Sequence, residues 1–174
     1  MSRITTYLTN ELYQIKNNTK IPEFPNVLVG GTFDHLHNGH IKLLIIACLA
    51  STEHLFIAVC SDKMVKYKKY SEYIEDEKTR YDNVVTILDF IKPELKKTVV
   101  IINNPYEQSL IFTQDLNALV LSSETYRDGF IINNKRTKKG LNRISILEIQ
   151  RSKTDISSTT IRKDIHYHYN KLNT

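Results

Sequence analysis

Apolar residues gather in short and long blocks along the chain, and this pattern predicts a regular succession of strands and helices. Short apolar runs, which are typical of buried strands, occupy residues 26–29, 55–60, 98–102, 116–121 and 144–149. A long apolar stretch in residues 38–50 predicts a buried helix, and residues 76–90 have apolar residues at helical spacing. Residues 158–169 are expected to form a final helix, and residues 125–139 are expected to be helical although they contain Gly129. Strands that alternate with helices form a parallel sheet that is covered on both faces.

The order of these elements predicts an α/β fold. We expect a three-layer α/β/α domain with a five-stranded parallel sheet, Rossmann-like in its winding. The first 20 residues stand apart, because their apolar residues are spaced as on one amphipathic helix and Pro22 and Pro25 follow. We therefore divide the chain into an N-terminal extension, residues 1–24, and one domain, residues 25–174. The extension is expected to be either a partner-binding helix or a cap on the core.

The composition is that of a globular protein with an anionic partner. Hydrophobic residues make up 41% and charged residues 25% of the 174 residues, and the net charge is +5. A basic chain suits nucleic acid, a membrane surface or a polyphosphate, and charge alone does not choose between them. The sequence has no apolar run long enough for a transmembrane helix and no signal peptide, and its two cysteines, Cys48 and Cys60, lie in apolar stretches. These features predict a cytoplasmic protein with reduced thiols.

Glycine is concentrated in one segment of the chain. Of only five glycines, three (Gly30, Gly31 and Gly39) fall within eleven residues that leave a predicted strand and open a predicted helix. The carboxyl end of a parallel strand is where ligands bind, and a helix N-terminus offers backbone N–H groups to an anion. His37 and His40, three positions apart, lie on one face of that helix start. The segment therefore predicts a phosphate-binding site.

Two segments of the chain resemble two signatures of one family. Residues 30–40 read GGTFDHLHNGH and resemble the first signature of the nucleotidylyltransferase superfamily, whose core is (T/H)-x-G-H. Residues 156–162 read ISSTTIR and resemble the second signature, I-S-S-T-x-x-R. The two segments occur in the order that the superfamily has, so each supports the other.

Within this superfamily the chain resembles the phosphopantetheine adenylyltransferases of eukaryotes and archaea. Residues 61–66, SDKMVK, resemble that family's basic loop after the second strand. Residues 120–129, VLSSETYRDG, resemble its S-x-E-T-Y-x-G-G element, with Asp128 in place of the first glycine. The resemblance covers residues 26–164. No G-x-x-x-x-G-K-[ST] loop occurs in the sequence, so we expect a stand-alone transferase without a fused kinase.

The resemblance implies a reaction of coenzyme A biosynthesis. The adenylyl group of ATP would pass to 4′-phosphopantetheine, giving dephospho-coenzyme A and pyrophosphate. The acceptor's own phosphate is the nucleophile, so the enzyme has to position the substrates and neutralise charge. Mg²⁺ is the expected cofactor, bridging phosphate oxygens without a dedicated set of protein ligands. Neither nucleic acid nor a membrane is an expected partner, and a monomer is the favoured expectation.

The resemblance also implies catalytic residues. His40 and His37 would stabilise the charge that develops at the α-phosphate. Lys66 would attract the acceptor phosphate, with Lys63 and Lys68 of the same loop as further candidates, and Arg127 would hold the departing pyrophosphate. The remaining expected residues bind substrate through the loop after the first strand and the start of the last helix: Gly30, Gly31, Thr32, Phe33, Asp34, Gly39, Ser157, Ser158 and Thr159.

Other functions remain open at this stage. A cytidylyltransferase that acts on an alcohol phosphate typically carries R-T-x-G-I-S-T-T, whereas residues 151–158 read RSKTDISS, with Asp155 in the place of that glycine. A nicotinamide-mononucleotide adenylyltransferase usually has G-S-F-N-P-x-H in the first signature. A nucleotide-binding module that has lost its activity is a third alternative, against which the intact His37, His40 and Ser158 argue.

For several of the candidate residues, another role is an alternative to the expected one. His35, His37 and His40 have a spacing similar to that of a binuclear zinc site, but Gly39 stands where such a site needs Asp. Residues 157–159 are also typical of a helix N-cap. Lys66 and Arg127 also fit ordinary surface positions, and the Tyr-rich basic loop after residue 61 also fits stacking with nucleic-acid bases.

Overall fold

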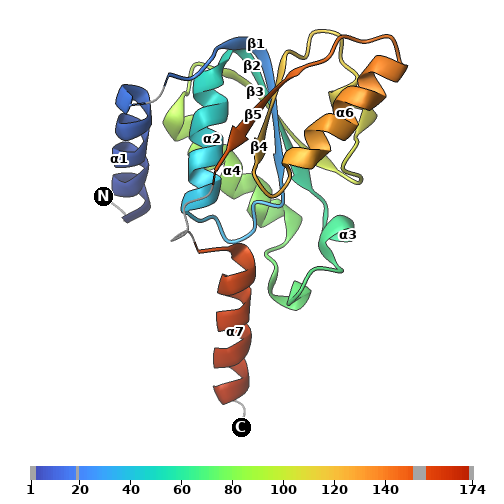
Figure 1. The fold of residues 1–174 in the computed structure, drawn as a ribbon. Coiled ribbons are helices and arrows are strands. Elements are labelled where there is room, and N and C mark those ends of the chain that lie inside the picture. Colours follow the sequence, from blue (N-terminus) through green and yellow to red (C-terminus); the bar gives the residue numbers. More distant parts are fainter. Residues whose placement is uncertain (1–2, 19, 151–155, 173–174) are drawn as a thin grey trace.

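The chain folds as three layers around one parallel sheet (Figure 1). The computed structural model describes residues 3–18, 20–150 and 156–172. Its strands are β1 (Phe24–Gly31), β2 (Ser51–Cys60), β3 (Lys96–Ile102), β4 (Ala118–Ser122) and β5 (Ser145–Ile149). They lie in the order β3-β2-β1-β4-β5, and every neighbouring pair is parallel. The predicted five-stranded α/β fold is thereby confirmed.

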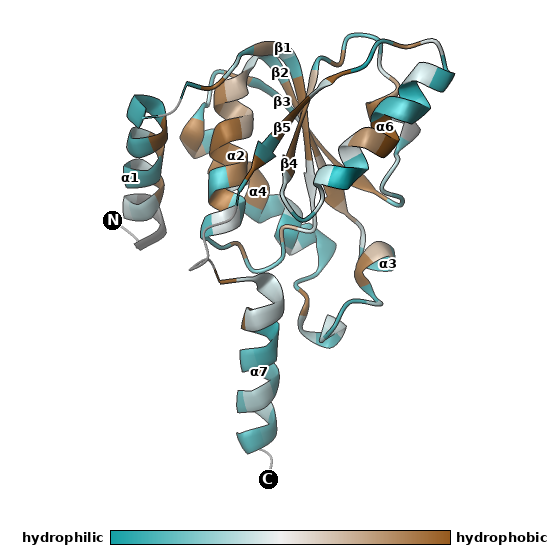
Figure 2. Ribbon diagram, in the orientation of Figure 1, coloured by the Kyte–Doolittle hydropathy of each residue, from teal (hydrophilic) through white to brown (hydrophobic). Residues whose placement is uncertain are grey.

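Helices cover both faces of this sheet. One face carries α2 (Asn38–Ala50), α4 (Glu77–Ile91) and, outside α2, α1 (Arg3–Asn18). The other carries α6 (Tyr126–Lys138) with the short helices α3 (Asp62–Val65) and α5 (Gln108–Ile111). Helix α2 is apolar almost all round because it lies buried between the sheet and its neighbours, as Figure 2 shows.

The N-terminal helix takes part in the main core. Leu8 and Ile15 of α1 are buried in the same hydrophobic cluster as α2, α4 and the strands between them. Of the two expectations for this helix, the structure therefore supports a cap on the core. The division into residues 1–24 and 25–174 stays a prediction.

Some elements differ from the prediction in extent. Strand β2 begins at Ser51, earlier than the apolar pattern indicated, since its polar start pairs through the backbone with Phe24 of β1. The segment after β2, predicted as a loop, contains α3 and the single 3₁₀ turn η1 (Ser71–Tyr73). Helices of three or four residues are too short to produce a periodic pattern.

Helix α7 (Ser158–Leu172) projects from the body of the protein and has a largely hydrophilic surface (Figures 1 and 2). It rests on η1 through aromatic contacts, in which the His166 ring lies 5.1 Å from Tyr70 and 5.7 Å from Tyr73, centroid to centroid. Within the described part of the chain, no helix combines the length and the apolar composition that a bilayer span requires.

The strand order creates the place for a site. Strands β1 and β4 are neighbours, and the chain leaves β1 toward β2 on one side and β4 toward β5 on the other. At such a reversal a crevice opens at the carboxyl ends of the strands. The first signature segment follows β1 directly, so it lies at this crevice.

Candidate active site

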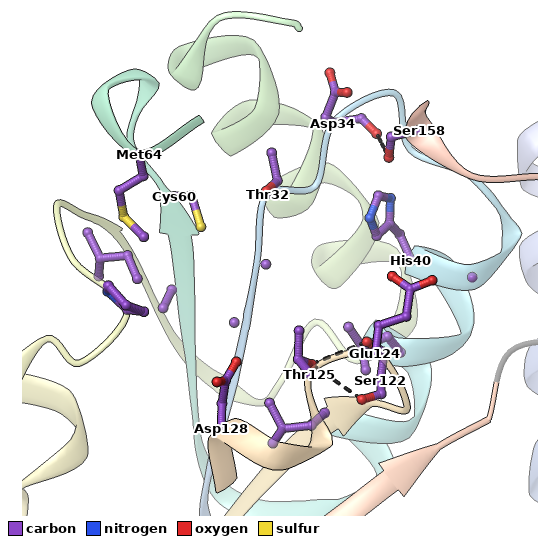
Figure 3. Close-up of a pocket in the computed structure, with 18 of the residues that line it drawn as sticks. Thr32, Asp34, His40, Cys60, Met64, Ser122, Glu124, Thr125, Asp128 and Ser158 are labelled. Atoms are coloured by element: carbon purple, nitrogen blue, oxygen red, sulfur yellow. Dashed lines mark hydrogen bonds between the residues drawn. The ribbon is translucent and has the colours of Figure 1, made fainter. Parts of the chain in front are cut away.

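A cavity of about 540 Å³ occupies the crevice at the ends of β1 and β4 (Figure 3). Both signature segments line it, although they are more than a hundred residues apart. Most of the expected site residues belong to the lining: Gly30, Gly31, Thr32, Asp34, His37, Gly39, His40, Ser157, Ser158 and Thr159. Phe33, Lys66 and Arg127 do not.

The two signature histidines form a fixed pair at the start of α2. His37 is the N-cap, and its Nδ1 accepts the backbone N–H of Gly39 at 3.1 Å. A neutral ring that accepts at Nδ1 carries its proton on Nε2, the nitrogen that can donate to a phosphate. The rings of His37 and His40 stack with centroids 4.0 Å apart. A Cβ on residue 39 would lie 3.1 Å from the His37 ring and would press on it, so glycine at this position favours the observed packing.

Phe33 packs against the His40 ring of this pair. Its side chain is fully buried, and its ring centroid lies 5.6 Å from that of His40. A Cβ on Gly31 would lie 3.1 Å from the same ring, so glycine at this position lets the strand end pass over it. Any contact of Phe33 with a substrate is therefore restricted to its backbone.

The loop between β1 and α2 has a strained backbone. Phe33 has a φ of 55° and His35 a φ of 43°, both in the left-handed region, which costs about 1–3 kcal/mol for each residue. Neighbouring side chains hold the loop in place: Arg80 donates to the Thr32 carbonyl at 2.8 Å, and Glu75 accepts the His35 N–H at 2.7 Å. Such strain persists only where the surroundings fix the backbone, which is typical of functional sites.

Asp34 joins the two signature segments. Its fully buried carboxylate accepts the backbone N–H of Glu75 at 3.0 Å and pairs with Arg162 of the second signature. Its carbonyl accepts the Ser158 hydroxyl at 2.8 Å. Both carboxylate oxygens are thus engaged within the protein. The structure gives Asp34 a positioning role, and its expected contact with substrate stays a prediction.

The start of α7 serves as a helix cap and lines the cavity. Ser157 Oγ accepts the backbone N–H of Thr160 at 3.1 Å, the usual N-cap bond. Thr159 Oγ1 accepts from Arg162 at 3.1 Å, which leaves its hydroxyl proton to be donated. A helix N-terminus that lines a cavity favours an anionic ligand. The cap bond is confirmed and is compatible with phosphate binding by residues 157–159, which stays a prediction.

Comparison with known proteins agrees with this geometry. The family model described as cytidylyltransferase-like matches residues 28–164, a span that contains both signature segments. The chain belongs to the cytidylyltransferase-like nucleotidyltransferases.

Relatives of this nucleotidyltransferase include archaeal and fungal proteins. A phosphopantetheine adenylyltransferase of Pyrobaculum aerophilum is 35% identical over 146 residues, 81% of this chain and 92% of that protein. An uncharacterised protein of Schizosaccharomyces pombe is 30% identical over 79% of this chain. That protein is longer, and the match spans only 47% of its length. The fold is also similar to the crystal structure of a protein of unknown function from Archaeoglobus fulgidus, which is 31% identical in sequence. The match covers 71% of this chain and 88% of that chain, with a TM-score of 0.60.

The loop after β2 supplies a different lysine from the one expected first. Lys68 Nζ of the nucleotidyltransferase donates to Thr32 Oγ1 at 2.7 Å, and Lys68 and Lys69 line the cavity. Both Lys66 and Lys68 are exposed, but Lys66 does not line the cavity, and its Nζ lies 4.8 Å from the ring centroid of Tyr67. The short helix α3 and the turn that follows it account for the change, because they place Lys68, and not Lys66, beside Thr32. We now expect Lys68 to attract the acceptor phosphate.

A lysine pair tests this assignment. Lys68→Met is expected to raise the KM for the acceptor about tenfold or more, because a charge-assisted contact with its phosphate is lost. Lys66→Met, the matched control on the same loop, should leave that KM within about twofold. Initial rates of pyrophosphate release give both values. A larger effect at Lys66 than at Lys68 would restore the first expectation.

Arg127 lies outside the cavity. Its side chain is exposed, and the next residue along α6, Asp128, lines the cavity instead. Since one helical position turns a side chain by about 100°, Arg127 points to a different side of α6. Its expected contact with pyrophosphate stays a prediction that this structure does not support.

The histidines do not form a metal triad. His35 Nε2 lies 2.8 Å from the Tyr73 carbonyl, away from the stacked pair. Among the described residues, one group of three side chains could hold a cation: Asp34, His35 and Glu75. Its atoms are already engaged, since Asp34 pairs with Arg162 and Glu75 accepts the His35 N–H. These residues do not fit a dedicated Mg²⁺ site, so we assign no ligand to the expected ion.

Arg80 was missed by the sequence analysis. It is fully buried and donates to the carbonyls of Thr32, Glu75 and Cys60, the last at 2.6 Å, while its second terminal nitrogen pairs with Asp62. It thus ties the strained loop to the end of β2. The available signal was a lone charge on the apolar face of the helix predicted over residues 76–90.

The cavity wall also contains a partly buried thiol, that of Cys60. Burial raises the pKa of Cys60, although the nearby Lys68, the Thr32 hydroxyl and Arg80 lower it in part. The thiol therefore stays protonated at neutral pH and acts as a small apolar part of the wall.

Proposed function

We propose that this nucleotidyltransferase transfers the adenylyl group of ATP to 4′-phosphopantetheine, giving dephospho-coenzyme A and pyrophosphate, as a cytosolic step of coenzyme A biosynthesis. An oxygen of the acceptor phosphate attacks the α-phosphorus, and the bond between the α-phosphorus and the bridging oxygen breaks. The electron pair leaves with pyrophosphate. Mg²⁺ would accompany the nucleotide.

The shape and chemistry of the cavity carry this proposal. From the histidines and Thr32 it continues over the sheet into a region lined by apolar side chains, among them Met64, Leu110, Ile111 and Ile132. Glycerol phosphate or phosphocholine is too short or too strongly charged to fill such a region. An acceptor with a phosphate at one end and a long, weakly polar arm suits it, because apolar walls favour apolar ligand surface.

The side chains supply positioning and charge neutralisation. His40 and the Nε2–H of His37 would donate to the α-phosphate oxygens. Thr32 and Lys68, hydrogen-bonded to each other, would hold the acceptor phosphate. The N-terminus of α7, with the Thr159 hydroxyl, would receive the β- and γ-phosphates. The names of the archaeal relatives agree with this substrate.

The test is a matrix of two nucleotides and three acceptors. Pyrophosphate release is measured with ATP or CTP and with 4′-phosphopantetheine, glycerol phosphate or phosphocholine, each with Mg²⁺, and mass spectrometry identifies the product. We expect release only with ATP and 4′-phosphopantetheine. Release with CTP and an alcohol phosphate would keep the family and overturn the substrate. Nucleotide binding without any release would indicate an inactive binding module.

A further inference from the structure

Four carboxylate side chains belong to the cavity lining, those of Asp34, Glu107, Glu124 and Asp128, and Asp128 is the one at the position where this chain departs from its family pattern. Asp128 lies in the first turn of α6, half-buried, and belongs to the lining. Figure 3 shows it directed into the pocket and well apart from Asp34 and Ser158. Within the described ranges, no side chain or backbone group forms a hydrogen bond or ion pair with its carboxylate.

The surroundings of Asp128 become apolar along the helix. Ile132, four residues later on the same face of α6, also lines the cavity and is buried with Leu110 and Ile111. Asp128 therefore stands at the border between the polar end, which holds the signature residues, and the apolar end. An acceptor that spans both ends and lies along this side of α6 would meet this carboxylate.

An acceptor that displaces water from Asp128 has to replace its hydrogen bonds. A carboxylate that loses water without gaining a donor carries a large desolvation cost, whereas an N–H or O–H group of the ligand satisfies it. A second negative charge at this point is repelled, and the weakly polar wall screens that repulsion poorly.

We propose that Asp128 determines acceptor specificity: it selects an uncharged arm that carries an amide N–H or a hydroxyl and rejects an arm that carries a carboxylate. The inference rests on the proposed function and deepens it, since the arm of phosphopantetheine contains two amides and a hydroxyl. The position of Asp128 near a helix N-terminus also favours a negative charge. This effect on α6 changes the stability of the protein and not its choice of acceptor. A measurement of thermal unfolding therefore separates it from the proposed effect on specificity.

The first experiment compares two acceptors that differ at the end of the arm. In 4′-phosphopantothenate the arm ends in a carboxylate where 4′-phosphopantetheine has its second amide and the thiol-bearing tail. Wild type is expected to prefer phosphopantetheine at least tenfold in kcat/KM, and Asp128→Asn to reduce this preference about tenfold with an unchanged KM for ATP. Asp115→Asn, which removes the same charge from an exposed residue outside the lining, should keep the wild-type preference. An unchanged preference in Asp128→Asn would overturn the inference.

The second experiment needs no turnover. Calorimetry measures the binding of the phosphate-free arms, pantetheine and pantothenate, to wild type and to Asp128→Asn, with thermal unfolding as the control for folding. We expect wild type to bind pantetheine at least tenfold more tightly than pantothenate, and the variant to lose this difference. Equal binding of both arms to wild type, or no binding of either, would overturn the inference. If pyrophosphate release fails with every acceptor, the proposed function falls and calorimetry alone decides the role of Asp128.

Discussion

Replacing His40 with alanine is expected to lower kcat for pyrophosphate release by about 10²–10³, with little change in the KM for either substrate. The imidazole lines the cavity at the start of α2, and its orientation is fixed by the stacked His37 and by Phe33. A donor held in this way stabilises charge that develops only in the transition state, so its loss acts on kcat more than on binding. Steady-state kinetics with ATP and 4′-phosphopantetheine measures both parameters.

A second histidine provides the control for this variant. His54 stacks on Phe56, binds the Thr98 hydroxyl at 2.8 Å and does not line the cavity. His54→Ala should leave kcat within about twofold, and thermal unfolding of both variants tests whether they fold. Equal losses of activity in the two variants would mean that His40 has no special part in the reaction.

Replacing Asp34 with alanine is expected to reduce the free energy of unfolding by about 3–5 kcal/mol. The change leaves the buried guanidinium of Arg162 without its partner carboxylate and the backbone N–H of Glu75 without an acceptor. An uncompensated buried charge is among the largest single costs that a mutation can impose. Urea unfolding followed by circular dichroism gives the value.

The exposed pair of Lys78 and Asp82 is the matched control for Asp34. Both side chains are more than half exposed, so Asp82→Ala should change the free energy of unfolding by no more than about 0.5 kcal/mol. The double variant Asp34→Ala/Arg162→Ala should be less destabilised than the sum of the single changes, because it removes the charge that Asp34→Ala strands. A loss below about 1 kcal/mol in Asp34→Ala would contradict the buried-pair argument.

The fold could be predicted because its signal is local. Each strand of the sheet contains a short apolar run, α2 is a longer apolar stretch, and α4 repeats apolar residues at helical spacing, so the alternation of these elements predicted a parallel sheet. The start of β2 was not predictable from this pattern, because its first residues pair through the backbone whatever their side chains. Helices α3 and α5 are set by tertiary contacts and leave no period in the sequence.

The site was predictable only in part, for a related reason. The glycines and histidines of residues 30–40 lie together in the sequence and were found as a group. Lys68 was hard to separate from Lys66, because the turns after β2 decide which lysine faces Thr32. Arg80 gave only the weak signal of one charge on an apolar helix face, since its partners are backbone carbonyls scattered along the chain.

The contacts of Asp34 with Ser158 and Arg162 are expected to form late in folding. The hydrogen bond from Ser158 spans 124 positions and the ion pair with Arg162 spans 128. Closing so long a stretch of chain is slow compared with pairing neighbouring elements. During synthesis, β1, β2 and the helices around them can assemble while the residues of α7 are still inside the ribosome. A nascent chain can therefore hold a nearly complete sheet, with its first loop already bound to Arg80 and Glu75, and still lack the contacts that Ser158 and Arg162 make with Asp34.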